Sequence, residues 1–418
     1  MKHISKLIGL CVAVAFVSYA SAGEVEDMKK MLEDQGINYV ETKLPAVKLS
    51  GYVDVSYMYN TEGGGSDATA TGTPSAARVF DRDSNDFSVN AVKLALEKPL
   101  ADENDWTAGF RIDTLFGEDA KYLGGNDPNN NELALEQAYV AFRIPVGNGL
   151  DFKFGKFTSI LGYEVLESPA NLNFSRGLLF NYALPISHVG ALASYRFNDN
   201  WDAQLGIVNG WNIDDNSFWA RSSKDFKKAV TGRINWTADG GNFNIANGFL
   251  ISPTGEQGAG FRTAENVWVY DMWANWTPKD VDKLLLGVNF DLGQVEGLST
   301  GKTLIPGKRD ALFYGAALYA KYQFTPKFSL AGRLDYLCDE AGYRTGTQAG
   351  GPWGVGSTDD EILSWTLTAG FDLWENMLAR LEYRYDTASA KVFGVNAQTG
   401  TGGSSDQHTI GVNMVYSF

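Results

Sequence analysis

The sequence predicts an all-β protein, a 16-stranded antiparallel transmembrane β-barrel, on the strength of three features of the chain. Apolar and polar residues alternate with a period of two in segment after segment. Short connections between these segments alternate with long ones. Tryptophans gather at the end of the apolar faces that borders the short connections.

The first 22 residues have the pattern of a secretory signal peptide. Two lysines precede an apolar run over residues 7–19, and Ala20, Ser21 and Ala22 supply the small residues of a cleavage site. The run is shorter than the ~20 residues that a membrane-spanning helix needs. We therefore expect residues 1–22 to be removed as a signal peptide.

Residues 23–46 are expected to form a short periplasmic helix and a linker. Val25, Met28 and Leu32 share one face of a helix over residues 24–35, and Pro45 closes the segment. A helix of this length is marginal alone. It is either a solvated stub or an element for oligomerisation or for contact with peptidoglycan.

Composition excludes several classes of function. The formal net charge of −15 argues against nucleic acid as a partner. Cys11 lies in the expected signal peptide and Cys338 stands alone, so no disulfide framework or CxxC site is expected. His188 and His408 have no convincing serine or cysteine partner for nucleophilic catalysis. We expect no enzymatic activity and no cofactor.

From residue 47 to residue 418 the chain is expected to form the barrel. Each alternating segment is close to the ~9–11 residues with which a tilted strand crosses a bilayer. An even number of strands, with short turns on one side and long loops on the other, is typical of outer-membrane barrels. The sixteen segments are 47–60, 86–98, 104–116, 133–145, 150–158, 188–197, 200–211, 227–238, 242–251, 265–277, 283–292, 312–324, 327–337, 361–374, 376–386 and 407–418.

Alternation alone also fits a soluble β-sandwich, which hides its apolar faces. The tryptophans are more selective, because an interfacial aromatic girdle would place them at one end of the apolar faces. Those at the short-turn ends are Trp106, Trp201, Trp236, Trp276 and Trp374. The last strand ends in Phe418, which resembles the assembly signal of bacterial outer-membrane barrels.

The third long connection, residues 159–187, has no strand period of its own. Loops of this length are uncommon unless they are functional or disordered. This one carries too many apolar residues, among them Leu161, Phe174 and Leu178, to be left in water. We expect it to fold inward and to narrow the mouth of the barrel.

Motifs around this connection resemble the OmpL-like family of β-barrel porins. They are Gly147-Asn148-Gly149-Leu150-Asp151, Gly155-Lys156-Phe157, Leu161-Gly162-Tyr163-Glu164, Asn173-Phe174-Ser175-Arg176, His188-Val189-Gly190 and Val208-Asn209-Gly210-Trp211. The resemblance covers most of the chain from residue 47 and is sharpest over residues 135–211. It implies an outer-membrane channel of a Gram-negative bacterium, without naming a solute. The layout is also similar to that of the general porins, and this analogy implies a homotrimer.

Such a channel would pass small hydrophilic solutes and ions by passive diffusion, and its lining would decide which. A basic arc beside residues 159–187 is predicted from four bases on successive strands, Arg111, Arg143, Lys153 and Arg196. Residues 159–187 bring Glu164 and Glu167 to it. Opposed charges at a constriction would create a transverse field. The arginines of segments 327–337 and 376–386 are better explained as salt ladders between strands. The candidate constriction and pore-lining residues are Arg111, Arg143, Lys153, Lys156, Glu164, Glu167, Arg176, Arg196, Arg333, Arg380 and Arg384.

Two other functions stay open on the sequence. One is a substrate-selective channel for sugars or oxyanions. Inward aromatic residues leave room for a sugar track; they are Tyr52, Tyr139, Trp273 and Tyr319. A scaffold barrel without transport is the other alternative. We expect no metal, since Asp81, Asp83 and Asn85 alternate like calcium ligands but lack the glycine and glutamate of an EF-hand loop.

Overall fold

The computed structural model describes most of the chain from residue 47 onward. The described ranges are 47–62, 85–101, 104–123, 132–211, 228–253, 266–281, 283–296, 310–340, 359–396 and 401–418, with a few isolated positions and residue pairs between them. The expected signal peptide, the expected periplasmic helix and linker, and both aspartates of the calcium candidate lie outside these residues. Asn85, the third member of that candidate, is described and has a positive φ of 64°.

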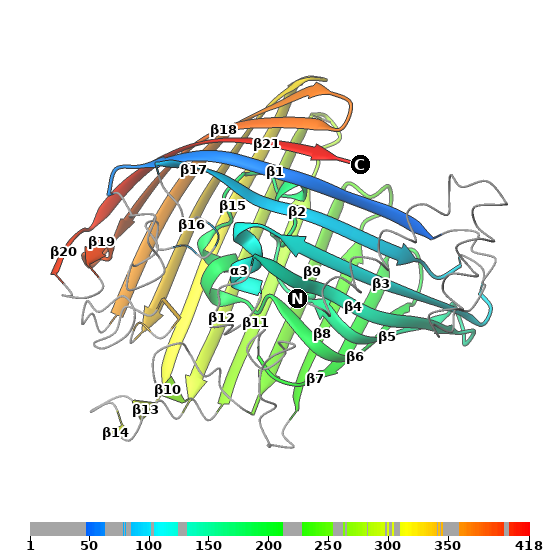
Figure 1. Cartoon of the computed structure of the whole chain (residues 1–418). Helices are drawn as coiled ribbons and strands as arrows, with labels where there is room; N and C mark the ends of the chain where they lie inside the picture. Colours follow the sequence, from blue (N-terminus) through cyan, green and yellow to red (C-terminus); the bar gives the residue numbers. More distant parts are fainter. Residues whose placement is uncertain are drawn as a thin grey trace, which may run out of the picture. The chain divides into compact units, whose positions relative to one another are not determined.

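Sixteen antiparallel strands form one closed sheet (Figure 1). The predicted 16-stranded barrel is therefore confirmed. Strands adjacent in the barrel pair in chain order, and β1 pairs with β21 to close the cylinder, with Tyr52 opposite Ser417. The strands are β1 (Lys48–Asn60), β2 (Asp86–Lys98), β3 (Thr107–Phe116), β4 (Leu133–Ile144), β5 (Leu150–Thr158), β6 (Ser187–Arg196), β7 (Trp201–Val208), β8 (Ala229–Thr237), β9 (Phe243–Ser252), β11 (Asn266–Trp276), β12 (Leu284–Glu296), β15 (Ala311–Thr325), β16 (Phe328–Glu340), β17 (Asp359–Trp374), β18 (Met377–Ala388) and β21 (Asp406–Ser417).

Several short elements lie in the connections. They are α3 (Glu118–Leu123), η1 (Ser168–Ala170), η2 (Leu179–Ala183), and the strands β10 (Arg262–Thr263), β13 (Ser299–Thr300), β14 (Thr303–Leu304), β19 (Phe393–Asn396) and β20 (Thr401–Ser404). Within the described ranges, no helix has the length and apolar character needed to cross a bilayer.

Most strands of the barrel have an exposed apolar face, as the alternation predicts. On β21, Ile410, Val412 and Met414 are each more than 40% exposed, whereas Thr409 and Asn413 on the other face of the strand are buried. A soluble sandwich would show the opposite arrangement, since its apolar face is the buried one. The exposed apolar faces are therefore those that meet lipid, and the alternating residues point into the cylinder.

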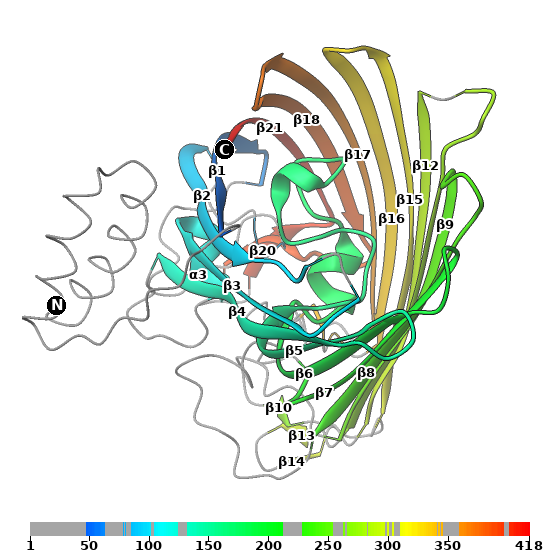
Figure 2. The ribbon, with the colours of Figure 1, turned by 90° about the vertical axis from the view of Figure 1, so that its right-hand side faces the viewer.

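The segment of residues 159–186, which joins β5 to β6, packs against buried wall residues on two sides (Figure 2). Leu178 and Leu179 belong to an apolar cluster with wall residues of strands from β5 to β17, such as Phe313. Leu166 and Phe180 belong to a second cluster with residues of β1 to β4. Many apolar residues of this segment are therefore buried.

A β-bulge changes which residues of β4 are buried. Asp113 pairs with Gln137 and Thr114 with Leu135, so Glu136 has no partner in the ladder. Both Glu136 and Gln137 are buried. An extra residue in one strand shifts the alternation of its faces. A strict period of two therefore fails to place Glu136 inside the barrel.

Candidate functional site

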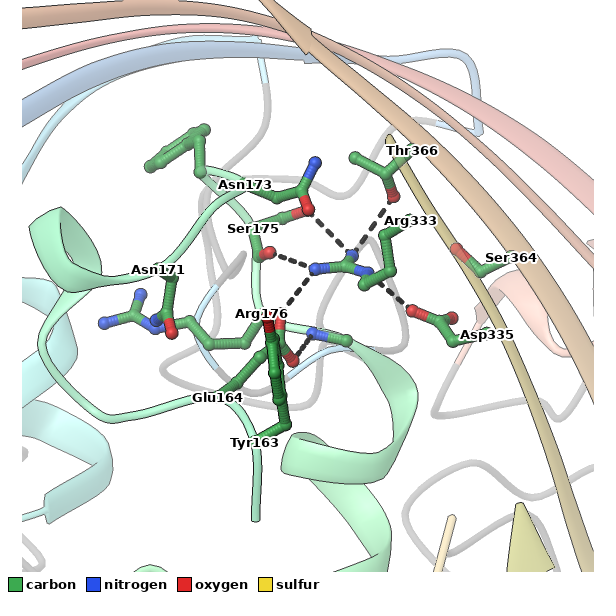
Figure 3. Close-up of polar contacts among 12 residues, drawn as sticks. Tyr163, Glu164, Asn171, Asn173, Ser175, Arg176, Arg333, Asp335, Ser364 and Thr366 are labelled. Atoms are coloured by element: carbon green, nitrogen blue, oxygen red, sulfur yellow. Dashed lines mark hydrogen bonds and ion pairs between the residues drawn. The ribbon is translucent and has the colours of Figure 1, made fainter. Parts of the chain in front are cut away.

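Arg333 of β16 joins the wall to the 159–186 segment (Figure 3). The side chain is fully buried, and its Nη1 donates to Glu164 Oε1 at 2.8 Å and to the carbonyl oxygen of Ser175. Its Nη2 donates to Thr366 Oγ1 at 3.1 Å. Its Nε lies 2.6 Å from Asp335 Oδ2. The expected ion pair of Arg333 with Asp335 is thus present, although it lies within β16 and not between strands. The same guanidinium also binds the segment.

Glu164 is the residue of the 159–186 segment that binds Arg333. Its Oε2 accepts a hydrogen bond from the backbone N–H of Gly177 at 2.6 Å. Burial raises the pKa of the Glu164 carboxyl, and the charge of Arg333 opposes that rise. Glu164 is therefore bonded on both oxygens inside the protein, so it does not supply a free negative charge to a passage.

β18 provides a second attachment. Arg380 donates from Nη2 to Ser168 Oγ at 2.7 Å and from Nη1 to the carbonyl oxygens of Ser168 and Asn173. The carboxylate of Glu382 accepts the backbone N–H of Phe174 at 2.7 Å. Backbone groups without regular secondary structure need such partners when they are buried. Arg380 and Glu382 therefore provide hydrogen-bond partners for backbone groups of Ser168, Asn173 and Phe174.

Arg384 of β18 is the third predicted arginine of this region. Its Nε donates to Asp386 Oδ2 at 3.0 Å on the same strand. Arg78 lies 2.7 Å from the other oxygen of Asp386 and donates to the carbonyl oxygen of Arg176. Arg384 therefore forms an ion pair within β18, whereas the predicted salt ladder joins neighbouring strands. The sequence did not predict the ion pair of Arg78 with Asp386.

Lys93 of β2 forms the third attachment, together with three carboxylates. Its Nζ lies 2.7 Å from Glu136, 2.7 Å from Glu167 and 3.1 Å from Asp113. The three acids could enclose a metal ion, since their oxygens lie within 4.8 Å of one another. The ammonium of Lys93 already provides the positive charge at this point. Glu167, like Glu164, is therefore bonded to a cation of the wall.

α3 and β11 hold the segment as well. Arg176 Nη2 lies 3.2 Å from Asp119 of α3, and its guanidinium carbon lies 4.5 Å from the ring centroid of Phe80. The backbone N–H of Gly162 donates to Asp271 Oδ2 at 2.9 Å. The segment is thus bonded to β2, β11, β16 and β18, and of these β2 and β11 lie on opposite sides of the barrel.

The basic arc predicted from four successive strands is not a single ring. Arg143 forms an ion pair with Asp151 and donates to the carbonyl oxygen of Ala101, beside the short connections. Arg196 is the last residue of β6, its side chain is 65% exposed, and it pairs with Asp199. Both were expected beside the segment, and this expectation was wrong because they lie at the opposite, short-turn ends of their strands.

The other predicted bases stay within the barrel wall. Arg111 is bonded to Asp113 at 2.9 Å and lies 3.4 Å from Glu97. Lys153 Nζ lies 4.8 Å from the ring centroid of Tyr139. Lys156 is buried on β5, where it pairs in register with Ala138. Because Glu164 and Glu167 are bonded to Arg333 and Lys93, the expected opposition between the arc and these two glutamates is not formed.

The inward aromatic residues are largely covered by the protein itself. Tyr163 of the segment stacks on Tyr319 with ring centroids 4.3 Å apart, and it meets Trp273 edge to face. Tyr52 is 7% exposed, and Lys153 lies over Tyr139. A sugar would need open ring faces, so Tyr52 and Tyr319 do not provide the expected sugar track.

A family model described as "Putative beta-barrel porin-2, OmpL-like" matches residues 46–418. The chain belongs to this porin family. With the closed barrel and its apolar outer faces, membership identifies the protein as a passive channel of the outer membrane. The resemblance read from the motifs near residue 160 is thereby confirmed.

Solved porin structures share the fold at low sequence identity. The outer membrane channel DcaP of Acinetobacter baumannii is 13% identical, with 91% of this chain and 100% of that chain covered and a TM-score of 0.56. The anion-selective porin from Comamonas acidovorans is 12% identical, with 89% and 99% covered and a TM-score of 0.58. OmpT of Vibrio cholerae, in a trimer form, is 11% identical, with 89% and 99% covered and a TM-score of 0.55. No curated protein matches the chain.

Proposed function

We propose that this porin is a diffusion channel for small hydrophilic solutes and ions in which the 159–186 segment sets the narrowest passage. The observation that carries the proposal is the set of attachments to β2, β11, β16 and β18. These strands lie on different sides of a closed barrel. A segment bonded to all of them through inward side chains has to cross the interior.

The path left for solutes follows from the same contacts. Glu167, Glu164 and Ser168 bind Lys93, Arg333 and Arg380, which places the segment against β2, β16 and β18. The wall from β3 to β8 carries side chains that are only half-buried, including Arg111, Lys153 and Arg233. We place the passage beside these strands, where Arg111 and Lys153 of the predicted lining would meet the solute.

We also propose a homotrimer in the outer membrane. The support is the fold that the chain shares with a porin whose solved structure is a trimer form, OmpT of Vibrio cholerae. Native mass spectrometry of the purified porin should give three times the mass of the mature chain. A monomer as the only species in several mild detergents would contradict the trimer.

Removal of the segment tests the channel proposal. Residues 164–182 are replaced by a short Gly-Ser linker, and single-channel conductance is measured in a planar bilayer. We expect conductance to rise, because the obstruction and its attachments are removed together. The control replaces residues 213–226, between β7 and β8, by the same linker. Equal conductance in the folded 164–182 variant and the native porin would contradict the proposal.

A point substitution that keeps the full chain tests the same proposal if the deletion variant does not fold. Ser168→Ala removes the hydroxyl that Arg380 Nη2 contacts at 2.7 Å and leaves every charge in place. We expect more frequent transitions between conductance levels, since one attachment of the segment is weakened. Heat-modifiable migration in gels shows whether both variants form the barrel.

A further inference from the structure

Two residues of the first long connection reach into the barrel. Arg78 and Phe80 lie between β1 and β2, and both are buried, with exposed fractions of 2% and 8%. Arg78 Nη2 donates to Ser364 Oγ of β17 at 3.0 Å and to Asp386 Oδ1 of β18 at 2.7 Å. Ser364 is fully buried, whereas Trp365, the next residue of β17, is 56% exposed on the outer face. The guanidinium of Arg78 therefore lies on the inner side of the wall.

The same guanidinium binds the 159–186 segment. Its Nη1 donates to the carbonyl oxygen of Arg176 at 2.9 Å. A planar guanidinium presents five donors in a fixed geometry, whereas the ammonium of a lysine is a single compact charge on a flexible chain. Arg78 thus joins β17, β18 and the segment through one side chain.

Phe80 contacts the side chain of the same segment residue. The guanidinium carbon of Arg176 lies 4.5 Å from the ring centroid of Phe80, and Arg176 Nη2 lies 3.2 Å from Asp119 of α3. The ring centroid of Phe80 also lies 5.9 Å from that of Phe180. Residues of the first two long connections therefore hold Arg176 at both its carbonyl oxygen and its guanidinium.

The attachment of the segment to β17 and β18 has a direction. In the order of strands around the closed sheet, β17 and β18 lie across the barrel from β6 and β7. The proposed passage runs beside β3 to β8. Arg78 therefore holds the segment, at Arg176, on the side of the barrel away from the passage.

Removal of Arg78 leaves the wall with an ion pair of its own. Arg384 Nε lies 3.0 Å from Asp386 Oδ2 within β18, and Gln407 of β21 donates to the same oxygen at 2.9 Å. Asp386 thus keeps a cation and an amide when Arg78 is replaced. The substitution R78M should therefore change the position of the segment much more than the stability of the barrel.

We propose that Arg78 and Phe80 are positioning residues of the channel, which form a strap from the first long connection and keep the 159–186 segment out of the passage. This inference rests on the proposed channel. A hydrogen bond from a charged group contributes enough to shift an equilibrium between two positions of the segment about tenfold or more. Without the strap, the segment moves more often toward β3 to β8, and the passage is closed for a larger part of the time.

Single-channel recording in a planar bilayer tests this inference. We expect the ratio of closed to open time in R78M/F80A to be about tenfold or more above that of the native porin, with the fully open level unchanged. R78K keeps the positive charge but loses the planar guanidinium, so it should also raise the ratio. Arg196→Met is the control, because it removes an exposed arginine of a short turn and should leave the ratio at the native value.

A covalent link tests the same contact in the opposite direction. Phe80→Cys and Phe180→Cys, in a Cys338→Ser background, place two thiols where the ring centroids lie 5.9 Å apart, and a short bismaleimide joins them. The link should return the ratio of closed to open time in an R78M porin toward the native value. Heat-modifiable migration in gels shows that each variant forms the barrel.

Three results would overturn the inference. They are a native ratio of closed to open time in R78M/F80A, a link that leaves the R78M porin unchanged, and a folded porin whose two thiols cannot be joined. In each case a rise in conductance on deletion of residues 164–182 would still support the channel, so the two failures can be told apart. A native porin without any conductance would instead contradict the channel itself.

Discussion

Replacement of Arg333 by methionine should release the 159–186 segment from β16. The guanidinium is the positive partner of both Glu164 and Asp335, and all three side chains are at most 4% exposed. Removal of one partner from a buried ion pair costs about 3–5 kcal/mol, because the remaining charge has no compensation. At about 1.4 kcal/mol per factor of ten, the detached state of the segment gains roughly two to three orders of magnitude.

Maleimide labelling of a buried cysteine measures this detachment. Leu178 is 1% exposed in the apolar cluster beside Phe313, and Leu178→Cys in a Cys338→Ser background places one thiol there. We expect Arg333→Met to speed labelling of this thiol by roughly a hundredfold or more, in line with the cost of a broken buried pair. An Arg333→Met porin that labels at the native rate would refute the reasoning.

A charge-compensated variant separates electrostatics from packing. Glu164→Gln and Asp335→Asn, combined with Arg333→Met, leave no uncompensated charge at the junction. Replacement of a whole buried ion cluster by neutral groups is often tolerated. The labelling rate should therefore return toward that of the native porin. A triple variant that labels as fast as Arg333→Met alone would show that lost side-chain packing controls the segment.

Three further predictions concern other parts of the chain. Lys93→Met leaves three acids with oxygens within 4.8 Å of one another and no ammonium, so it should lower the temperature of the unfolding transition measured by circular dichroism; an unchanged transition would count against this role. Gly162→Val combines a positive φ of 97° with a Cβ 2.8 Å from a methyl of Leu184, and the strain of about 1–3 kcal/mol should increase current noise in bilayer recordings; noise equal to that of the native porin would contradict it. Deletion of Phe418 removes the reciprocal backbone hydrogen bonds with Gly51 that join the two ends of the barrel, so the heat-modifiable fraction in outer membranes should fall, whereas Phe418→Tyr should keep it.

The barrel itself could be predicted from the sequence because its determinants are local. A strand that meets lipid on one face and the interior on the other repeats every two residues. Each of the sixteen predicted segments corresponds to a strand of the barrel. The β-bulge could not be predicted in this way. The register shift in the β3–β4 pair turns Glu136 inward, and the alternation of apolar and polar residues in β4 gives no sign of this shift.

The candidate site was predicted less well for two physical reasons. The height of a residue along the barrel axis depends on the stagger between strands, and a list of inward residues does not contain this stagger. The sequence therefore predicts Arg143 and Arg196 beside the segment, whereas they lie at the short turns. The segment also has no period, so its partners are decided by tertiary contacts. Its apolar composition indicated burial, but not that Glu164 would bind Arg333 or that Glu167 would bind Lys93.

An experimental density map of the purified porin tests the central claim most directly. The claim is that the 159–186 segment lies inside the cylinder, attached to opposite walls. We expect side-chain density that connects Arg333 to Glu164 and Arg380 to Ser168, with Leu179 packed against Gly315 of β15. An interior without density at these positions, with the segment extending outside the barrel, would contradict the account.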